Sequence, residues 1–162
     1  MEETFQDSGY LQIVMFDLAG EIYGLRLDIV QEVIRLSGMT TVPQTPDFIE
    51  GVINLRGFFI PVVDLRKRFG LGSVEKTKSA RIMIVEIGEN ILGIAVDGVL
   101  EVTSLSEDGI ELPSPLIRTT IKMDYLVGFS EFNGEMLKIL DLEKIFSMKE
   151  FERLKELEEN LA

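Results

Sequence analysis

An internal repeat limits the folds open to this chain more than any single segment does. Two parts of the sequence match at a constant offset of 77 positions, in the pairs Gly51/Gly128, Gly57/Gly134, Asp64/Asp141, Leu65/Leu142 and Phe69/Phe146. Further upstream the offset is 69 positions, in the pairs Gly24/Gly93, Asp28/Asp97 and Glu32/Glu101. The sequence therefore predicts a duplicated half, over about residues 10–70 and 80–147. The change of offset places an insertion within residues 114–124, which we expect to form a loop.

The sharpest turn signal is a short stretch between two apolar runs, made of Asn54, Leu55, Arg56 and Gly57. The flanking runs at 51–53 and 58–63 are typical of strands, so the stretch predicts a hairpin with Arg56 at its exposed tip. Asp64 follows the second strand. We expect its carboxylate to cap a short helical turn, because aspartate accepts hydrogen bonds from the free backbone N–H groups there.

Most other segments also read as short strands. Residues 10–18 and 22–27 predict one hairpin, and residues 81–87 and 90–96 predict its second copy. Asp28, with Gln31 three positions later, is interpreted as the N-cap of a helical turn through Glu32. A counterpart turn is expected after Asp97. Short strands with turn signals throughout favour paired small barrels or a sandwich.

The last residues have a different period. Residues 147–150 match a capping box, and Phe151, Leu154, Leu157 and Leu161 recur at helical spacing. The sequence predicts a C-terminal amphipathic helix over 148–162, and residues 1–9 are expected to be a flexible acidic N-terminus. We expect the apolar stripe of the helix to pack on the protein's own strands. Docking of the stripe onto a partner is the alternative.

Composition excludes several function classes. The chain of 162 residues has no Cys and no His, so it lacks thiol nucleophiles, imidazole bases and the usual zinc ligands. We expect no catalytic site, no cofactor and no metal. A net charge of −12 disfavours nucleic acid and anionic membranes as partners. No apolar stretch approaches the ~20 residues of a membrane helix, and no secretory signal is seen, so we expect a cytoplasmic protein without direct membrane contact.

The strand and turn motifs together resemble a known family. The run from Gly51 to Gly57, the Pro-Val-Val-Asp-Leu segment at 61–65 and the Val-Asp-Gly-Val segment at 96–99 are similar to those of CheW proteins, the bacterial chemotaxis coupling proteins. The resemblance covers about residues 10–147 and implies a mainly β fold. It implies two SH3-like five-stranded β-barrels around a shared hydrophobic core, with short one-turn helices. Strands can cross between such barrels, so repeat and barrel need not coincide.

Family membership also implies a function. Members are non-enzymatic adaptors that couple chemoreceptors to the histidine kinase CheA in higher-order signalling arrays. One surface binds the regulatory domain of the kinase, and another binds the cytoplasmic hairpin tip of the receptors.

The family's receptor-facing region maps onto two segments of this chain. The expected receptor-binding residues are Val30, Glu32, Val33, Asn54, Leu55, Arg56, Gly57 and Val99. We hypothesise that Glu32 and Arg56 form an ion pair beside an apolar groove lined by Val30 and Val99. The alternative is that Arg56 is an ordinary tip residue. Asn133 stands where the second half would carry the matching cation, so only the first half is expected to bind receptors in this way.

Two alternatives to the adaptor stay open from the sequence. The same fold occurs as the regulatory domain of the kinase, so this chain could be such a domain excised from its protein. A generic SH3-like peptide-binding module is the second alternative, and it would want an exposed aromatic groove.

Overall fold

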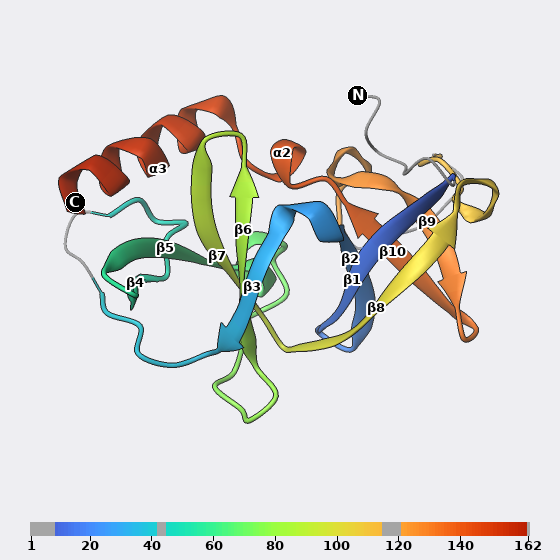
Figure 1. Ribbon diagram of the computed structural model, residues 1–162, viewed down its shortest axis with the longest axis horizontal. Coiled ribbons are helices and arrows are strands. Elements are labelled where there is room, and N and C mark those ends of the chain that lie inside the picture. Colours follow the sequence, from blue (N-terminus) through green and yellow to red (C-terminus); the bar gives the residue numbers. More distant parts are fainter. Residues whose placement is uncertain (1–8, 42–44, 115–120, 162) are drawn as a thin grey trace.

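The computed structural model describes residues 9–41, 45–114 and 121–161, and Figure 1 shows them as two β-sheets side by side with one long helix. The first sheet has the strand order β8–β1–β2–β10–β9. Its strands are β1 (Tyr10–Leu18), β2 (Glu21–Arg26), β8 (Gly98–Ser106), β9 (Leu126–Phe132) and β10 (Glu135–Leu140). The second sheet has the order β3–β6–β7–β5–β4. Its strands are β3 (Val30–Arg35), β4 (Gly51–Leu55), β5 (Phe58–Asp64), β6 (Arg81–Ile87) and β7 (Asn90–Val96).

The helices are short except for the last one. The α-helices are α1 (Leu65–Arg68), α2 (Leu142–Ile145) and α3 (Met148–Leu161), and the 3-10 turns are Leu27–Ile29, Glu107–Gly109 and Met123–Tyr125. The prediction of a mainly β fold with two five-stranded sheets, one-turn helices and a C-terminal helix is confirmed. The predicted insertion at 114–124 lies largely outside the described residues.

Each sheet takes its central hairpin from the opposite half of the repeat. The β1–β2 hairpin of the first half lies between β8 and β10, and the β6–β7 hairpin of the second half lies between β3 and β5. Parallel pairing of β2 with β10 and of β5 with β7 joins the halves within each sheet. The two sheets are equivalent strand for strand, but neither half forms a sheet alone. Repeat and barrel therefore do not coincide.

Two equivalent glycines lie on the strands that form these parallel pairs, and they allow each strand to pack closely against the other strand of its own hairpin. Gly24 pairs with Ile139, and Gly93 pairs with Val62. A Cβ atom at Gly24 would lie 2.4 Å from Cγ2 of Ile13, and one at Gly93 would lie 2.7 Å from Cγ2 of Ile82. A side chain larger than hydrogen would therefore displace the neighbouring strand, which explains why both copies of the hairpin carry glycine there.

One large hydrophobic core spans both sheets. It includes Phe16 and Tyr23 of the first sheet and Val62 and Ile94 of the second, all buried. A row of aromatic rings runs through it. The ring centroids are 5.9 Å apart for Phe16 and Tyr23, 6.1 Å for Tyr23 and Phe69, and 5.7 Å for Phe69 and Tyr125. Because the row connects β1 and β2 to the end of α1, the two sheets pack as one unit.

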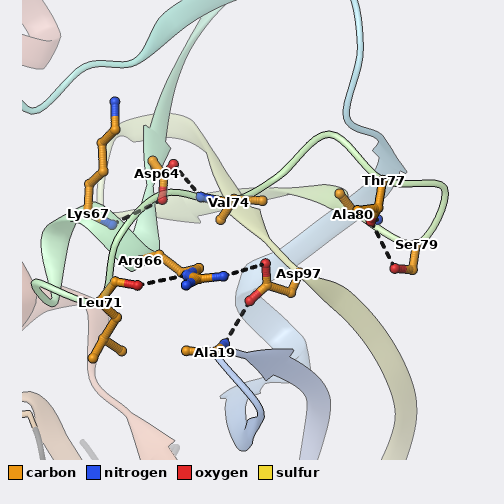
Figure 2. A network of polar contacts seen from close by, with 10 residues as sticks. All are labelled: Ala19, Asp64, Arg66, Lys67, Leu71, Val74, Thr77, Ser79, Ala80 and Asp97. Atoms are coloured by element: carbon orange, nitrogen blue, oxygen red, sulfur yellow. Dashed lines mark hydrogen bonds and ion pairs between the residues drawn. The ribbon is translucent and has the colours of Figure 1, made fainter.

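A polar network also holds the sheets together (Figure 2). The carboxylate of Asp97, in the connection between β7 and β8, accepts a hydrogen bond of 2.7 Å from the Ala19 amide at the β1–β2 turn. Its other oxygen lies 3.5 Å from the guanidinium of Arg66 on α1. Nearby, buried Asp64 accepts from the amides of Lys67, at 3.1 Å, and Val74, at 2.9 Å. The predicted cap at Asp64 is thus present.

The helical turns expected after Asp28 and Asp97 are not found as predicted. The first is a 3-10 turn at Leu27–Ile29 that follows Arg26, and strand β3 already begins at Val30. After Asp97 the chain enters β8 at once, at Gly98. Asp97 bonds to the distant Ala19 amide instead of a local one, so tertiary contact overrides the capping pattern.

The C-terminal helix α3 is capped as its sequence predicts. The Ser147 hydroxyl accepts from the Glu150 amide at 3.1 Å, and the Glu150 carboxylate accepts from the Ser147 amide at 2.8 Å. Arg68 donates two hydrogen bonds to the Glu150 carboxylate, of 2.7 and 2.6 Å. Burial alone would raise the pKa of Glu150, but these bonds from Arg68 and Ser147 outweigh it and lower the pKa. Leu154 is fully buried, and Phe151 and Leu157 pack against the same core, so this part of the apolar stripe packs on the protein's own strands, beside β5 and β7.

Truncation of the stripe tests this packing. Leu154→Ala is expected to lower the free energy of unfolding by about 2–5 kcal/mol, because it removes a buried side chain and leaves a cavity. Denaturant unfolding measures the change, and Lys155→Ala, at an exposed position of the same helix, is the matched control. Equal stability of the two variants would contradict docking of α3.

Candidate partner-binding surface

The β4–β5 hairpin ends in a two-residue turn of unusual composition. Leu55 pairs with Phe58 across it, and the turn residues Arg56 and Gly57 have φ angles of 51° and 89°. Two positive φ angles define the type I′ turn, which matches the twist of the strands and normally selects asparagine or glycine. Asn54 accepts a hydrogen bond of 2.9 Å from the Gly57 amide, which stabilises the turn. Arginine at this φ is uncommon, because its Cβ crowds the backbone.

Two other hairpins have the same turn geometry: the β1–β2 hairpin, and the β9–β10 hairpin that is the repeat counterpart of β4–β5. Ala19 and Gly20 have φ angles of 53° and 83°, and Asn133 and Gly134 have 51° and 82°. The same turn therefore accepts several residues at its first position. The arginine therefore adds a positive charge to the turn without changing its backbone conformation.

The Arg56 side chain reaches across the open side of the second sheet. Strands β3 and β4 are the two edges of that sheet. From the tip of the β4–β5 hairpin, Arg56 contacts Glu32 on β3 with its two terminal guanidinium nitrogens. Nη1 donates to Oε2 at 3.2 Å, and Nη2 donates to Oε1 in a closer contact. The ion pair thus links the two edges. We call the region between them, around Glu32 and Arg56, the seam.

The two charges remain open to solvent. The Arg56 side chain is 69% exposed and that of Glu32 is 32% exposed. The hydrogen bond from Arg56 lowers the pKa of Glu32, although partial desolvation opposes it, and the bond to Glu32 raises the pKa of Arg56. Both groups are charged at neutral pH. The pair therefore orients a guanidinium that a partner can still reach.

The remaining predicted receptor-binding residues are spread over both sheets. Val30 and Leu55 are half-buried, whereas Val33 lies on the outer face of β3 and is 39% exposed. Val99 is half-buried on β8, in the first sheet. The structure brings Glu32 and Arg56 together. Val33 is the next residue of β3, so its side chain points to the opposite face of the strand from that of Glu32. A groove between Val30 and Val99 stays a prediction.

Two exposed aromatic residues on the same hairpin were not singled out from the sequence. Phe58 is 74% exposed and Phe59 is 44% exposed. Strand β5 pairs with β7 only over Val62–Asp64, so the outer end of the hairpin projects as a two-stranded arm. Their apolar run looks like a buried strand in the sequence. Phe58 is exposed because it lies far along β5 from the part that pairs with β7. No local sequence pattern indicates where that pairing ends.

Two kinds of feature are missing from the described part of the chain, a cluster of metal ligands and a membrane-spanning helix. Within residues 9–41, 45–114 and 121–161, no three acidic residues gather in a way that could hold a metal ion. Over the same residues, no helix is both long and apolar enough to span a membrane.

Comparison with known proteins identifies the family. A family model described as the CheW-like domain matches residues 12–150. The chain is 36% identical over 139 residues to a chemotaxis protein CheW of Klebsiella aerogenes, covering 86% of this chain and 83% of the relative. It is 31% identical to a chemotaxis protein CheW of Treponema pallidum, covering 90% of this chain and 88% of the relative.

A solved structure agrees in sequence and in fold. The crystal structure of the scaffolding protein TtCheW from Thermoanaerobacter tengcongensis has 45% sequence identity and a TM-score of 0.77, covering 85% of this chain and 88% of the other. The family model and these relatives define the class as the scaffold proteins of the chemotaxis system. The chain belongs to the CheW family.

The turn geometry predicts that the arginine is not needed for stability. Arg56→Asn gives the tip the residue of its counterpart Asn133, which tolerates positive φ, and it removes only an exposed ion pair. We expect the melting temperature to change by no more than about 2 °C in a domain of this size. Differential scanning calorimetry measures it, with Arg153→Asn as an exposed control. A loss of several degrees for Arg56→Asn alone would show that the seam is structural.

Proposed function

We propose that this protein is a non-enzymatic adaptor that couples chemoreceptors to the histidine kinase CheA in the cytoplasm. The observation that carries the proposal is the seam, where Glu32 fixes an exposed guanidinium beside apolar side chains. Membership of the CheW family supports the same reading. Receptor and kinase would bind separate surfaces, so that one molecule bridges them within a larger signalling array.

The receptor's hairpin tip is proposed to dock at the seam. The tip of such a receptor is an antiparallel helical hairpin, and helices bind to partners through apolar anchors flanked by charges. Val30, Val33, Leu55 and Val99 would supply the apolar contacts. Arg56 and Glu32 would orient the helix, and Asn54 and Gly57 would hold the turn that presents the guanidinium.

The kinase's regulatory domain is proposed to bind elsewhere. In the family that domain resembles the adaptor in fold. A barrel end of the adaptor would therefore meet a similar barrel end of the regulatory domain in a pseudo-symmetric way. Those contacts lie on loops without a fixed motif, and we assign no residues to them. The curated relatives in Klebsiella aerogenes and Treponema pallidum are covered over 83% and 88% of their length, which favours a free-standing adaptor over an excised kinase domain.

An NMR titration tests the two-surface proposal. The isotope-labelled protein is titrated with a receptor hairpin-tip fragment and, separately, with a CheA regulatory domain. We expect the receptor fragment to shift the amides of residues 30–33 and 54–57, and the kinase domain to shift a different set. Arg56→Asn is expected to weaken receptor binding at least tenfold, a loss of about 1.4 kcal/mol, and to leave kinase binding unchanged.

Asn133→Asp serves as the control at the equivalent turn, because it changes charge in the other half of the repeat. It is expected to leave receptor binding within about twofold of the wild type, a difference of about 0.4 kcal/mol. Competition of both partners for one set of amides would rule out bridging.

A further inference from the structure

A cluster of cations lies at the end of β3, in a chain whose net charge is −12. Arg35, the last residue of β3, stands directly opposite Arg81, the first residue of β6. Like charges at directly opposed positions of an antiparallel pair are destabilising. The linker between α1 and β6 adds Lys76 and Lys78 at the same end, since the Leu36 amide bonds to the Ala80 carbonyl. We call Arg35, Lys76, Lys78 and Arg81 the basic cluster.

Carboxylates do not neutralise this cluster. The ion pairs of the described residues involve other cations, among them Arg56, Arg66, Arg68 and Lys138. The guanidinium of Arg81 donates to the backbone carbonyls of Lys78, at 2.7 Å, and of Ala80, at 2.9 Å. Glu75 is the one acidic residue of the linker, and Lys76, Lys78 and Arg35 are exposed. The cluster therefore keeps its positive charge.

Hydrogen bonds hold the linker in place around these lysines. The Thr77 hydroxyl accepts from the Ala80 amide at 3.2 Å and lies 3.1 Å from the Ser79 hydroxyl. Figure 2 shows Thr77, Ser79 and Ala80 close together in the linker. With Arg81 bound to the Lys78 carbonyl, the turn is ordered before any partner arrives. A preordered turn loses less conformational entropy on binding.

The cluster continues the outer face of β3. Gln31, Val33 and Arg35 alternate as the exposed residues of that strand. Glu86 accepts a hydrogen bond from Gln31 at one end, whereas Arg35 and Arg81 lie at the other end. Val33, the exposed apolar residue between them, belongs to the proposed receptor-binding surface. A helix lying along β3 over Val33 would thus meet positive charge at one end only.

We propose that the basic cluster binds acidic side chains of the receptor segment that docks at Val33, and so sets the direction in which that segment lies. The inference rests on the proposed function, because it assumes that receptors bind at the seam. An electrostatic contact of this kind acts mainly on the association rate and on its dependence on salt.

The test measures association of the full-length protein with a receptor hairpin-tip fragment at about 0.01 M and about 0.15 M salt, where the Debye length is about 30 Å and about 8 Å. Lys76→Glu/Lys78→Glu is expected to slow association about tenfold at low salt and to remove most of the salt dependence. Lys76→Gln/Lys78→Gln should show a smaller effect in the same direction. Lys144→Glu/Lys149→Glu, at exposed positions of α2 and α3, makes the same change in net charge and is the matched control.

We call Lys76→Glu/Lys78→Glu the reversal pair and Lys144→Glu/Lys149→Glu the control pair. Equal slowing of association by both pairs would overturn the inference, because net charge alone would then explain the effect. Weakened binding of the kinase's regulatory domain, or of a second copy of this chain, with receptor binding unchanged, would overturn it too. If the wild type binds the fragment and Arg56→Asn abolishes that binding while the reversal pair has no effect, the inference fails and the proposed function stands. If the wild type does not bind the fragment at either salt concentration, the proposed function itself fails.

Discussion

The exchange of hairpins between the two halves of the repeat is the constraint on which the rest of the structure depends. Each sheet is completed only when β1–β2 or β6–β7 enters it from the other half. The exchanged hairpins carry glycine at positions 24 and 93, where a Cβ atom would overlap an isoleucine on the other strand of the same hairpin. The exchange also brings Asp97 to the Ala19 amide and Phe69 to Tyr23. The core is therefore shared, and we expect the two sheets to unfold together.

A shared core lets equivalent surface positions differ without loss of the fold. The turns at Arg56 and Asn133 have the same backbone, with φ angles of 51° in both. One carries a guanidinium that pairs with Glu32, and the other carries a neutral amide, although the repeat has Glu101 at the position that corresponds to Glu32. A duplicated domain can in this way present two unlike surfaces from one architecture. An adaptor needs unlike surfaces, because it must bind two partners at once.

Much of this architecture follows from the sequence, since hairpins and caps are local. The offsets of 77 and 69 positions mark the repeat, and Asp64 and Ser147 form the caps that their neighbours predict. The contact of Glu32 with Arg56 was inferred from family resemblance, because residues 24 positions apart carry no local signal. What depends on tertiary contact was missed. Asp28 does not cap a helix. The exposure of Phe58 depends on how little of β5 pairs with β7, which no local sequence pattern indicates.

Reconstitution of the signalling complex tests the central claim most directly. Receptor-containing membranes, CheA and this protein are combined, and kinase autophosphorylation is measured with and without a receptor ligand. We expect the wild type to place the kinase under ligand control, and Arg56→Asn to bind the kinase's regulatory domain normally but to lose that control. Full ligand control with Arg56→Asn would contradict the claim that receptors bind at the seam between β3 and the β4–β5 hairpin.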